Sequence, residues 1–300
     1  MKLLVVGASG FVGRHTLSYA RSLGCEVAGT QSRAARPDLI SCDLRRHRIA
    51  DCVEASFLGG DEPVFGVICA TFGQMDRCFL HRQAAHEVNV EQTVRLIKDF
   101  QALGVKPVFL SSSFVFDGET GSYDEESPRS PISEYGRHKV EVERFIEDHA
   151  PGALVLRLDK VVGDDPLEFH LFSEWYRWIK EGRPITCIRD QFFAPTFVGD
   201  VAEAIVVGCR KGLAGFYHVA SSQFFKRDDL AREFVAALGQ KARILSKPQE
   251  EFGFLDRRPM KSYLNSNKFV AATAMRFTSM PEVFDSFLKK AQREAAHVVG

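Results

Sequence analysis

Short apolar runs alternate with longer amphipathic stretches through the first half of the chain. The apolar runs are rich in β-branched and aromatic residues, which predicts strands at 2–6, 26–30, 39–42, 64–70, 107–111 and 153–162. Apolar positions at helical spacing predict helices at 14–23, 87–103 and 133–149. Strands that alternate with helices indicate βαβ units, so we expect an α/β fold built on a doubly wound parallel sheet that is buried on both faces.

The pattern changes after about residue 163. An aromatic-rich helix is expected at 167–180, and further helices at 198–209 and 227–238 precede a loop-rich stretch to about 267. We therefore predict a large domain of residues 1–165, to which 196–222 return, and a smaller mixed α/β region of residues 166–195 and 223–300. The aromatic cluster from Phe169 to Trp178 is expected to be the packing surface of the smaller region, with a base-stacking pocket as the alternative.

Composition and charge are those of an ordinary globular protein. Of the 300 residues, 45% are hydrophobic and 26% are charged, with 39 basic and 39 acidic side chains. Since no basic excess is available to neutralise a nucleic-acid backbone, we expect no nucleic-acid partner. No apolar run is long enough for a signal peptide or a membrane span, which favours a cytoplasmic protein without a membrane partner.

The cysteines and histidines predict neither disulfides nor a metal site. The chain has seven cysteines and no Cys-x-x-Cys pair, which argues against a disulfide framework and against a zinc ribbon. The nine histidines show no metal-binding spacing such as His-x-x-x-His. We therefore expect reduced cysteines and no metal, and we expect His138 to be an exposed residue of its helix.

A glycine-rich loop directly follows the first predicted strand and opens the first helix. In this position Gly-x-x-Gly-x-x-Gly allows a tight turn and lets the backbone approach a pyrophosphate at the helix N-terminus. The alternative is a glycine-rich turn without a ligand. We interpret the loop as the phosphate-binding turn of a Rossmann-type dinucleotide domain, and the cofactor contacts predicted in it are Gly7, Ser9, Gly10, Phe11, Val12 and Gly13.

The end of the second predicted strand indicates which nicotinamide cofactor binds. A site selective for NAD usually places an acidic residue here, and the segment 28–33 has none. Arg33 suits a 2′-phosphate, although it is equally a candidate for a solvated loop charge, so we expect NADP, with NAD possible. Asp43 either caps the next turn or contacts the adenine amine. Leu44 and Ala70 complete the predicted cofactor contacts.

Tyr135 and Lys139 are four residues apart and therefore share one face of a predicted helix. A lysine ammonium beside a phenol lowers the tyrosine pKa, which suits a general acid acting on a carbonyl. The spacing alone is common by chance. Ser112 follows a predicted strand, where its hydroxyl can bind a substrate carbonyl at the carboxyl edge of the sheet. Ser111 and Ser113 are close alternatives for this role. The non-catalytic alternative is a serine turn that only caps the end of the strand.

Several motifs along most of the chain together carry a family resemblance. They are Asn89-Val90 with Thr93, Leu110 to Gly118, Tyr135-Gly136-x-x-Lys139, Asp190-Gln191-x-x-Ala194-Pro195-Thr196, Gly215 to Val219, and Arg258-Pro259-x-x-Ser262-x-Leu264. In these motifs the chain resembles the extended short-chain dehydrogenase/reductases, and within them the dTDP-4-dehydrorhamnose reductase branch. The resemblance implies NADPH-dependent reduction of a keto group on a nucleotide-activated sugar, and possibly a homodimer.

The resemblance also implies roles for individual residues. Ser112, Tyr135 and Lys139 would be the catalytic set, with Tyr135 and Lys139 also contacting the cofactor. Asn89 would anchor a water that leads to Lys139, or would simply cap its helix. The substrate contacts implied are Phe72, Ser112, Ser113, Lys160, Gln191 and Arg258. Phe72 is alternatively a core residue, and Arg258 is alternatively part of a solvated charge run.

The chain also departs from the branch at positions that touch substrate in its members. Ser113 and Phe114 stand where the branch has Asp and Tyr, and Lys160 stands where it often has Trp. The sequence therefore leaves the sugar open. The alternative functions are an NAD-dependent nucleotide-sugar epimerase of the same family, or a non-catalytic NADP-binding regulatory protein like the regulatory subunit of methionine adenosyltransferase.

Overall fold

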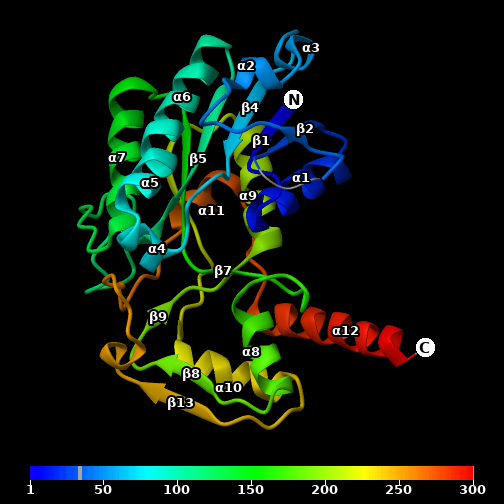
Figure 1. Cartoon of the computed structure of the whole chain (residues 1–300), viewed down its shortest axis with the longest axis vertical. Helices are drawn as coiled ribbons and strands as arrows, with labels where there is room; N and C mark the ends of the chain where they lie inside the picture. The colour runs from blue at the N-terminus through cyan, green and yellow to red at the C-terminus, as the bar shows by residue number, and fades with distance from the viewer. Residues whose placement is uncertain (33–35, 300) are drawn as a thin grey trace.

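A seven-stranded parallel sheet forms the centre of the computed structural model, which describes residues 1–32 and 36–299 (Figure 1). The strand order is β11-β6-β5-β4-β1-β2-β3. The strands are β1 (Lys2–Val6), β2 (Glu26–Gln31), β3 (Ile40–Ser41), β4 (Val64–Ile68), β5 (Lys106–Ser112), β6 (Leu154–Leu158) and β11 (Gly215–Val219). The order reverses direction between β1 and β4, which makes this pair the switch point where such folds bind ligands. The predicted α/β class with a doubly wound parallel sheet is confirmed.

Helices cover both faces of this sheet. Leu3 and Val5 of β1 pack on one face against α1 (Phe11–Ser22), α9 (Val198–Arg210) and α11 (Asn267–Thr273). Leu4 and Val6 pack on the other face, against α2 (Ile49–Cys52), α6 (Gln92–Ala102) and α7 (Glu134–His149). Because successive side chains of a strand point to opposite faces, a strand covered on both sides needs a continuous apolar run. This explains the sequence Leu-Leu-Val-Val of β1.

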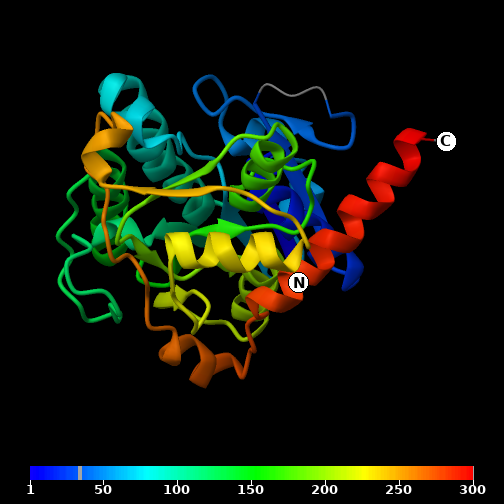
Figure 2. The same ribbon diagram turned by 90° about the horizontal axis from the view of Figure 1, so that it is seen from below.

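The smaller part of the molecule has an apolar core of its own, in the lower half of Figure 1. It is formed by α8 (Leu171–Lys180), α10 (Arg227–Ala237), α12 (Met280–Val299), β8 (Ile185–Ile188) and β13 (Ile244–Lys247). Phe172 and Trp175 are fully buried in it, as the packing interpretation of the aromatic cluster predicts, whereas Phe169 is 75% exposed. Figure 2 shows α10 running beneath the molecule and α12 projecting from it. The domain boundaries expected from the sequence stay a prediction.

Several predicted elements differ in their boundaries. The expected strand 153–162 divides into β6 and β7 (Val161–Val162), because the chain leaves the sheet at Asp159 and β7 pairs with β10 (Thr196–Phe197). The expected helix 167–180 begins only at Leu171, where His170 is the N-cap. The expected helix 87–103 opens with a π-turn. That turn and the remaining elements are η1 (Glu87–Glu91), α3 (Ala55–Leu58), α4 (Met75–Leu80), α5 (Arg82–His86), η2 (Ser113–Val115), β9 (Phe192–Phe193), β12 (Phe225–Lys226) and η3 (Gln249–Phe252).

No helix within residues 1–32 and 36–299 combines the length and the apolar character that crossing a membrane requires.

Asp159 joins the large sheet to two segments of the smaller part. Its Oδ1 accepts hydrogen bonds from Ser113 Oγ at 2.9 Å and from Ser262 Oγ at 2.8 Å. Its Oδ2 accepts a hydrogen bond from the backbone N–H of Ala194 at 2.6 Å. Burial raises the pKa of this carboxyl to about 6, although the three hydrogen bonds oppose the shift. One carboxylate therefore holds together three segments that are distant in the sequence.

Replacing Asp159 with Asn should destabilise the protein by about 1–3 kcal/mol, because the amide NH₂ cannot accept a bond from the Ala194 N–H. Urea unfolding measures this loss, and the exposed Asp148→Asn is the matched control. Since the pKa of Asp159 is higher in the folded than in the unfolded chain, protonation stabilises the fold as the pH falls from about 6 to 4. The Asp159→Asn variant should lack this pH-dependent contribution. If the stability difference between the wild type and the variant were the same at about pH 6 and about pH 4, the role of Asp159 would be contradicted.

Candidate active site and cofactor cleft

The glycine loop after β1 is shaped by two close approaches of the backbone. Gly7 has a φ of +85°, and a Cβ there would lie 2.6 Å from the backbone nitrogen of Ala70. A Cβ on Gly13 would lie 2.4 Å from the carbonyl oxygen of Gly7. Gly10 precedes α1, whose first turn contains no acidic residue. Its N-terminus therefore offers unpaired backbone N–H groups and a positive dipole end to an anion.

A cavity of ≈ 540 Å³ opens beside this loop at the carboxyl ends of β1, β2 and β4. Six of the predicted cofactor residues line it, namely Gly7, Ser9, Gly10, Asp43, Leu44 and Ala70. Phe11, Val12, Gly13, Tyr135 and Lys139 do not line it. Phe11 instead stacks on His170, with ring centroids 5.7 Å apart. Arg33, predicted for the 2′-phosphate, lies outside the described residues.

The wall at the end of β2 carries no acidic side chain in residues 30–32. Thr30 Oγ1 accepts a hydrogen bond from the Gly7 N–H at 3.4 Å, and Ser32 is exposed to the cavity. Asp43 accepts hydrogen bonds from the backbone N–H and the guanidinium of Arg45, and the guanidinium lowers its pKa to about 2. Asp43 thus caps its turn, as one alternative predicts, and its contact with adenine stays a prediction.

The first turn of α7 packs directly on the end of β5. Ser133 caps this helix by accepting a bond from the Gly136 N–H at 3.1 Å. A Cβ on Gly136 would lie 2.1 Å from the carbonyl oxygen of Phe114, so only glycine allows this approach. Ser112 ends β5 and accepts a bond from the Phe114 N–H at 3.2 Å. The structure therefore brings Tyr135 on α7 next to the short turn that follows Ser112.

Lys139 is buried, and its Nζ donates a hydrogen bond to the backbone carbonyl of Leu110 at 2.8 Å. The same Nζ lies 5.4 Å from the ring centroid of Tyr135. Burial lowers the pKa of Lys139 to about 8, which the Glu143 carboxylate opposes. Burial raises the pKa of Tyr135 to about 12, with only a hydrogen bond to Thr71 acting against it. The expectation that Lys139 lowers the tyrosine pKa is therefore wrong for this arrangement, because its ammonium is held by Leu110.

Asn89 and His138 differ from their expected surroundings. Asn89 does not cap a helix; it lies within the π-turn Glu87–Glu91 and is buried. Its Oδ1 accepts bonds from Thr71 Oγ1 at 3.1 Å and from the Phe72 N–H at 2.7 Å, which fixes the loop after β4. His138, expected to be exposed, is 2% exposed and lies with Nδ1 3.3 Å from Asn89 Nδ2. Lys139 projects into the protein from the neighbouring position of the same helix.

The predicted substrate residues Ser113, Phe72 and Lys160 lie in different surroundings. Ser113 is buried and bonded to Asp159, so it serves the junction between the two parts. Phe72 is half-buried and lines the cavity rather than the core. The Lys160 side chain keeps an exposed surface, but the protein around its ammonium lowers its pKa to about 8. Arg227 and Arg258 add to that lowering through their positive charge.

Arg227 and Arg258 are held in place by neighbouring side chains. Arg227 donates to Gln191 Oε1 at 2.8 Å. Arg258 forms an ion pair with Asp76 at 3.0 Å and covers the ring of Phe254 at 3.8 Å. Arg258 is therefore no solvated charge, and its Nε is buried without a hydrogen-bond partner. With Lys160 these arginines form a group of positive charges that act on one another, which suits an anionic ligand.

Sequence reasoning does not single out Arg227 or Thr71. Arg227 follows Lys226 at the start of a predicted helix, and Thr71 lies in a glycine-containing loop, so neither has a recognisable spacing. Their proximity to Lys160 and Tyr135 arises only from the tertiary structure. Conversely, Ser112, Tyr135, Lys139, Lys160, Gln191 and Arg258 all belong to motifs, which made them visible in the sequence.

With this geometry in place, comparison with known proteins places the chain in a family. The family described as RmlD substrate binding domain matches residues 1–293. The chain belongs to this family. The resemblance to the dTDP-4-dehydrorhamnose reductase branch is thereby confirmed.

The proteins similar to this chain are named for different roles. The chain is 29% identical over 273 residues to a probable low-salt glycan biosynthesis reductase of Haloferax volcanii, covering 88% of this chain and 90% of that protein. It is 26% identical over 280 residues to the methionine adenosyltransferase 2 subunit beta of Danio rerio, covering 89% and 83%. The crystal structure of dTDP-4-dehydrorhamnose reductase from Bacillus anthracis in complex with NADP shares its fold, with a TM-score of 0.83 and 21% identity over 96% of this chain and 99% of that one.

Replacing Asn89 with Ala should loosen the loop after β4, because the Phe72 N–H and the Thr71 hydroxyl lose their shared acceptor. We expect a stability loss of about 1–3 kcal/mol and faster hydrogen exchange at the Phe72 amide, measured by urea unfolding and NMR. Asn267→Ala, at an exposed asparagine of α11, is the control. An unchanged exchange rate at Phe72 would show that other contacts hold the loop.

Proposed function

We propose that this protein reduces a keto group on a nucleotide-activated sugar with NADPH. The observation that carries the proposal is the packing of α7 on the turn after Ser112. The Lys139 Nζ reaches the Leu110 carbonyl, and the Tyr135 ring lies 6.3 Å from that of Phe114. Tyr135 also hydrogen-bonds to Thr71, which lines the glycine-loop cavity. A tyrosine, a buried lysine and a serine hydroxyl at the carboxyl edge of a parallel sheet suit carbonyl reduction.

The residues present fit a dinucleotide cofactor. Gly7 and Gly13 let the loop pack closely against Ala70 and against itself, where a Cβ would collide with the backbone. Gly7, Ser9 and Gly10 line the cavity at the α1 N-terminus, where a pyrophosphate would bind. The lack of an acidic residue at the end of β2 favours NADPH over NADH, in line with the NADP complex of the Bacillus anthracis structure. When bound, NADPH supplies the hydride.

In the proposed mechanism, the Ser112 hydroxyl binds the substrate carbonyl and Tyr135 donates the proton. Because the Tyr135 pKa lies near 12, the phenol is protonated at neutral pH and is ready to act as an acid. As the proton leaves, negative charge develops on the phenol oxygen, and the Lys139 ammonium one helical turn away stabilises it electrostatically. Lys139 must turn from the Leu110 carbonyl toward the phenol to do so.

The group of positive charges around Lys160 supports a phosphorylated substrate. Lys160, Arg227 and Arg258 concentrate positive charge, and guanidinium groups match phosphate oxygens bidentately. A nucleoside diphosphate linked to a sugar can place its diphosphate here and its keto carbon near Tyr135. The Haloferax volcanii relative is a probable low-salt glycan biosynthesis reductase, which supports the same substrate class.

Tyr135→Phe should reduce kcat by at least about 100-fold, since general acid catalysis contributes about 10²–10⁴-fold. NADPH oxidation with a panel of nucleotide-activated keto sugars measures the loss, and NADPH fluorescence should show unchanged cofactor affinity. Tyr263→Phe, at a tyrosine outside the cavity, is the control. An active Tyr135→Phe enzyme would move the acid to another residue.

The same assay separates the alternative functions. Silence of the wild-type protein across the panel, together with tight NADPH binding, would replace the reductase proposal with that of a non-catalytic NADP-binding regulatory protein. One similar protein, from Danio rerio, is a subunit of methionine adenosyltransferase 2. Purification with tightly bound NAD would instead favour an epimerase.

Lys160→Met should weaken substrate binding and leave NADPH binding unchanged, because Lys160 does not line the glycine-loop cavity. Loss of one charge-assisted contact costs about 1.5–3 kcal/mol, so KM should rise roughly 10- to 100-fold. Steady-state kinetics measure KM, and fluorescence titration measures the NADPH Kd. Lys211→Met, at an exposed lysine after α9, is the control. An unchanged KM would exclude Lys160 from the substrate site.

A further inference from the structure

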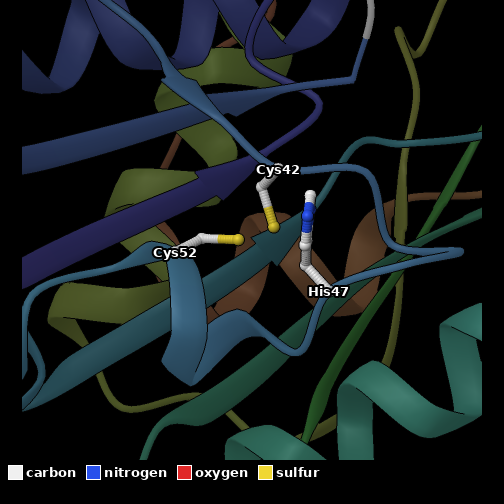
Figure 3. Close-up of side chains that lie close together, drawn as sticks. All are labelled: Cys42, His47 and Cys52. Carbon is white, nitrogen blue, oxygen red and sulfur yellow. The ribbon is translucent and has the colours of Figure 1, made fainter.

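Two cysteines and one histidine converge beside the cofactor cavity. Cys42 directly follows β3, His47 lies in the following turn, and Cys52 is the last residue of α2. One potential ligand atom from each residue lies within 4.8 Å of those of the other two. Figure 3 shows the two sulfur atoms and the His47 ring pointing toward one another.

These residues are a suitable donor set for a thiophilic cation. Thiolate sulfur and imidazole nitrogen are the preferred ligands of Zn²⁺, at distances of about 2.3 Å and 2.0–2.1 Å from the metal. In a tetrahedral site such ligands lie roughly 3.5–3.8 Å apart. The three donors therefore need inward movements of about 1 Å, which side-chain rotation provides. The spacing Cys-x4-His-x4-Cys is regular but matches neither metal pattern considered in the sequence.

The cluster has an open side, and a cation that binds there must displace thiol protons. Burial raises the pKa of the Cys42 thiol to about 12, with Cys52 adding to the shift. Of the nearby arginines, Arg45 is paired with Asp43 and Arg48 with Asp99. Cys42 is buried and Cys52 is half-buried, while His47 is exposed and leaves a path for an ion to enter. Three protein ligands leave the fourth tetrahedral position for water.

The histidine has one nitrogen lone pair available in its neutral form. Its Nδ1 accepts a hydrogen bond from the backbone N–H of Asp43 at 3.2 Å, so Nδ1 is the unprotonated ring nitrogen in the neutral form. A metal at Nδ1 would replace that hydrogen bond and release the Asp43 N–H to water. Metal binding would therefore alter the turn that begins at Cys42.

We propose that Cys42, His47 and Cys52 form a binding site for a thiophilic divalent cation of the zinc type. The cation would link the turn after β3 to α2 and fix their relative position. Because Cys42, Asp43, Leu44 and Arg45 also line the cavity beside the glycine loop, the site would be coupled to whatever occupies that cavity. Only this coupling rests on the proposed function; the metal site itself does not.

Titration of the reduced full-length protein with Co²⁺ tests the site. We expect one equivalent to produce the visible d–d bands of tetrahedral cobalt together with a thiolate-to-cobalt charge-transfer band, and Zn²⁺ to displace it. Cys52→Ser and His47→Gln should each weaken binding at least tenfold. Cys25→Ser, which removes a half-buried cysteine that belongs to no such cluster, should bind like the wild type.

Three results would overturn the proposal: no thiolate charge-transfer band in the reduced wild type, equal cobalt binding by Cys52→Ser, or freshly purified protein with a Cys42–Cys52 disulfide and no metal by native mass spectrometry. Far-UV circular dichroism of each variant shows whether it is folded, so a lost band is assigned to lost ligands. NADPH affinity measured with and without Zn²⁺ tests the coupling separately. Failure of NADPH to bind would contradict the proposed function and leave the metal site standing.

Discussion

The arrangement of the cleft depends on the hydrogen bonds of one buried carboxylate. Asp159 receives Ser113 from the end of β5, Ala194 from the loop before β10, and Ser262 from the C-terminal quarter of the chain. Its neighbours along the chain are Leu158, which ends the buried strand β6, and Lys160, which has an exposed side chain. The interaction that joins the sheet to the smaller part therefore also fixes the backbone next to Lys160. A buried carboxylate is costly without such partners, so the three donors are required together.

Positive charge gathers in two places. The N-terminus of α1 directly follows the glycine loop, whose close backbone approaches Gly7 and Gly13 make possible. Lys160, Arg227 and Arg258 form the second group, and burial lowers the pKa of each. The charges of the two arginines add to the lowering at Lys160, whereas Asp76 and Asp256 oppose it at Arg258. An anion bound beside this group would offset the repulsion at Lys160.

Motifs predicted the site residues more completely than they predicted their environments. Ser112, Tyr135 and Lys139 could be found from their spacing and from their places after a strand and within a helix. The tyrosine pKa could not, because it depends on burial and on the Leu110 carbonyl that holds the lysine ammonium. His138 was expected at the surface, yet it is buried against Asn89, because the π-turn that contains Asn89 packs on α7, a contact that no periodicity reveals.

The sequence by itself determined the sheet, its burial on both faces and the glycine loop, because these follow from local patterns of apolar residues and glycines. It also determined the family, whose motifs extend over most of the chain. Only the tertiary structure decided which distant residues meet. Arg227 joins Lys160, Ser262 joins Asp159, and Cys52 reaches Cys42 through chain crossings and turns that bring together segments without a shared periodicity. Contacts between such segments depend on how the elements pack in three dimensions, and a linear pattern does not contain that information.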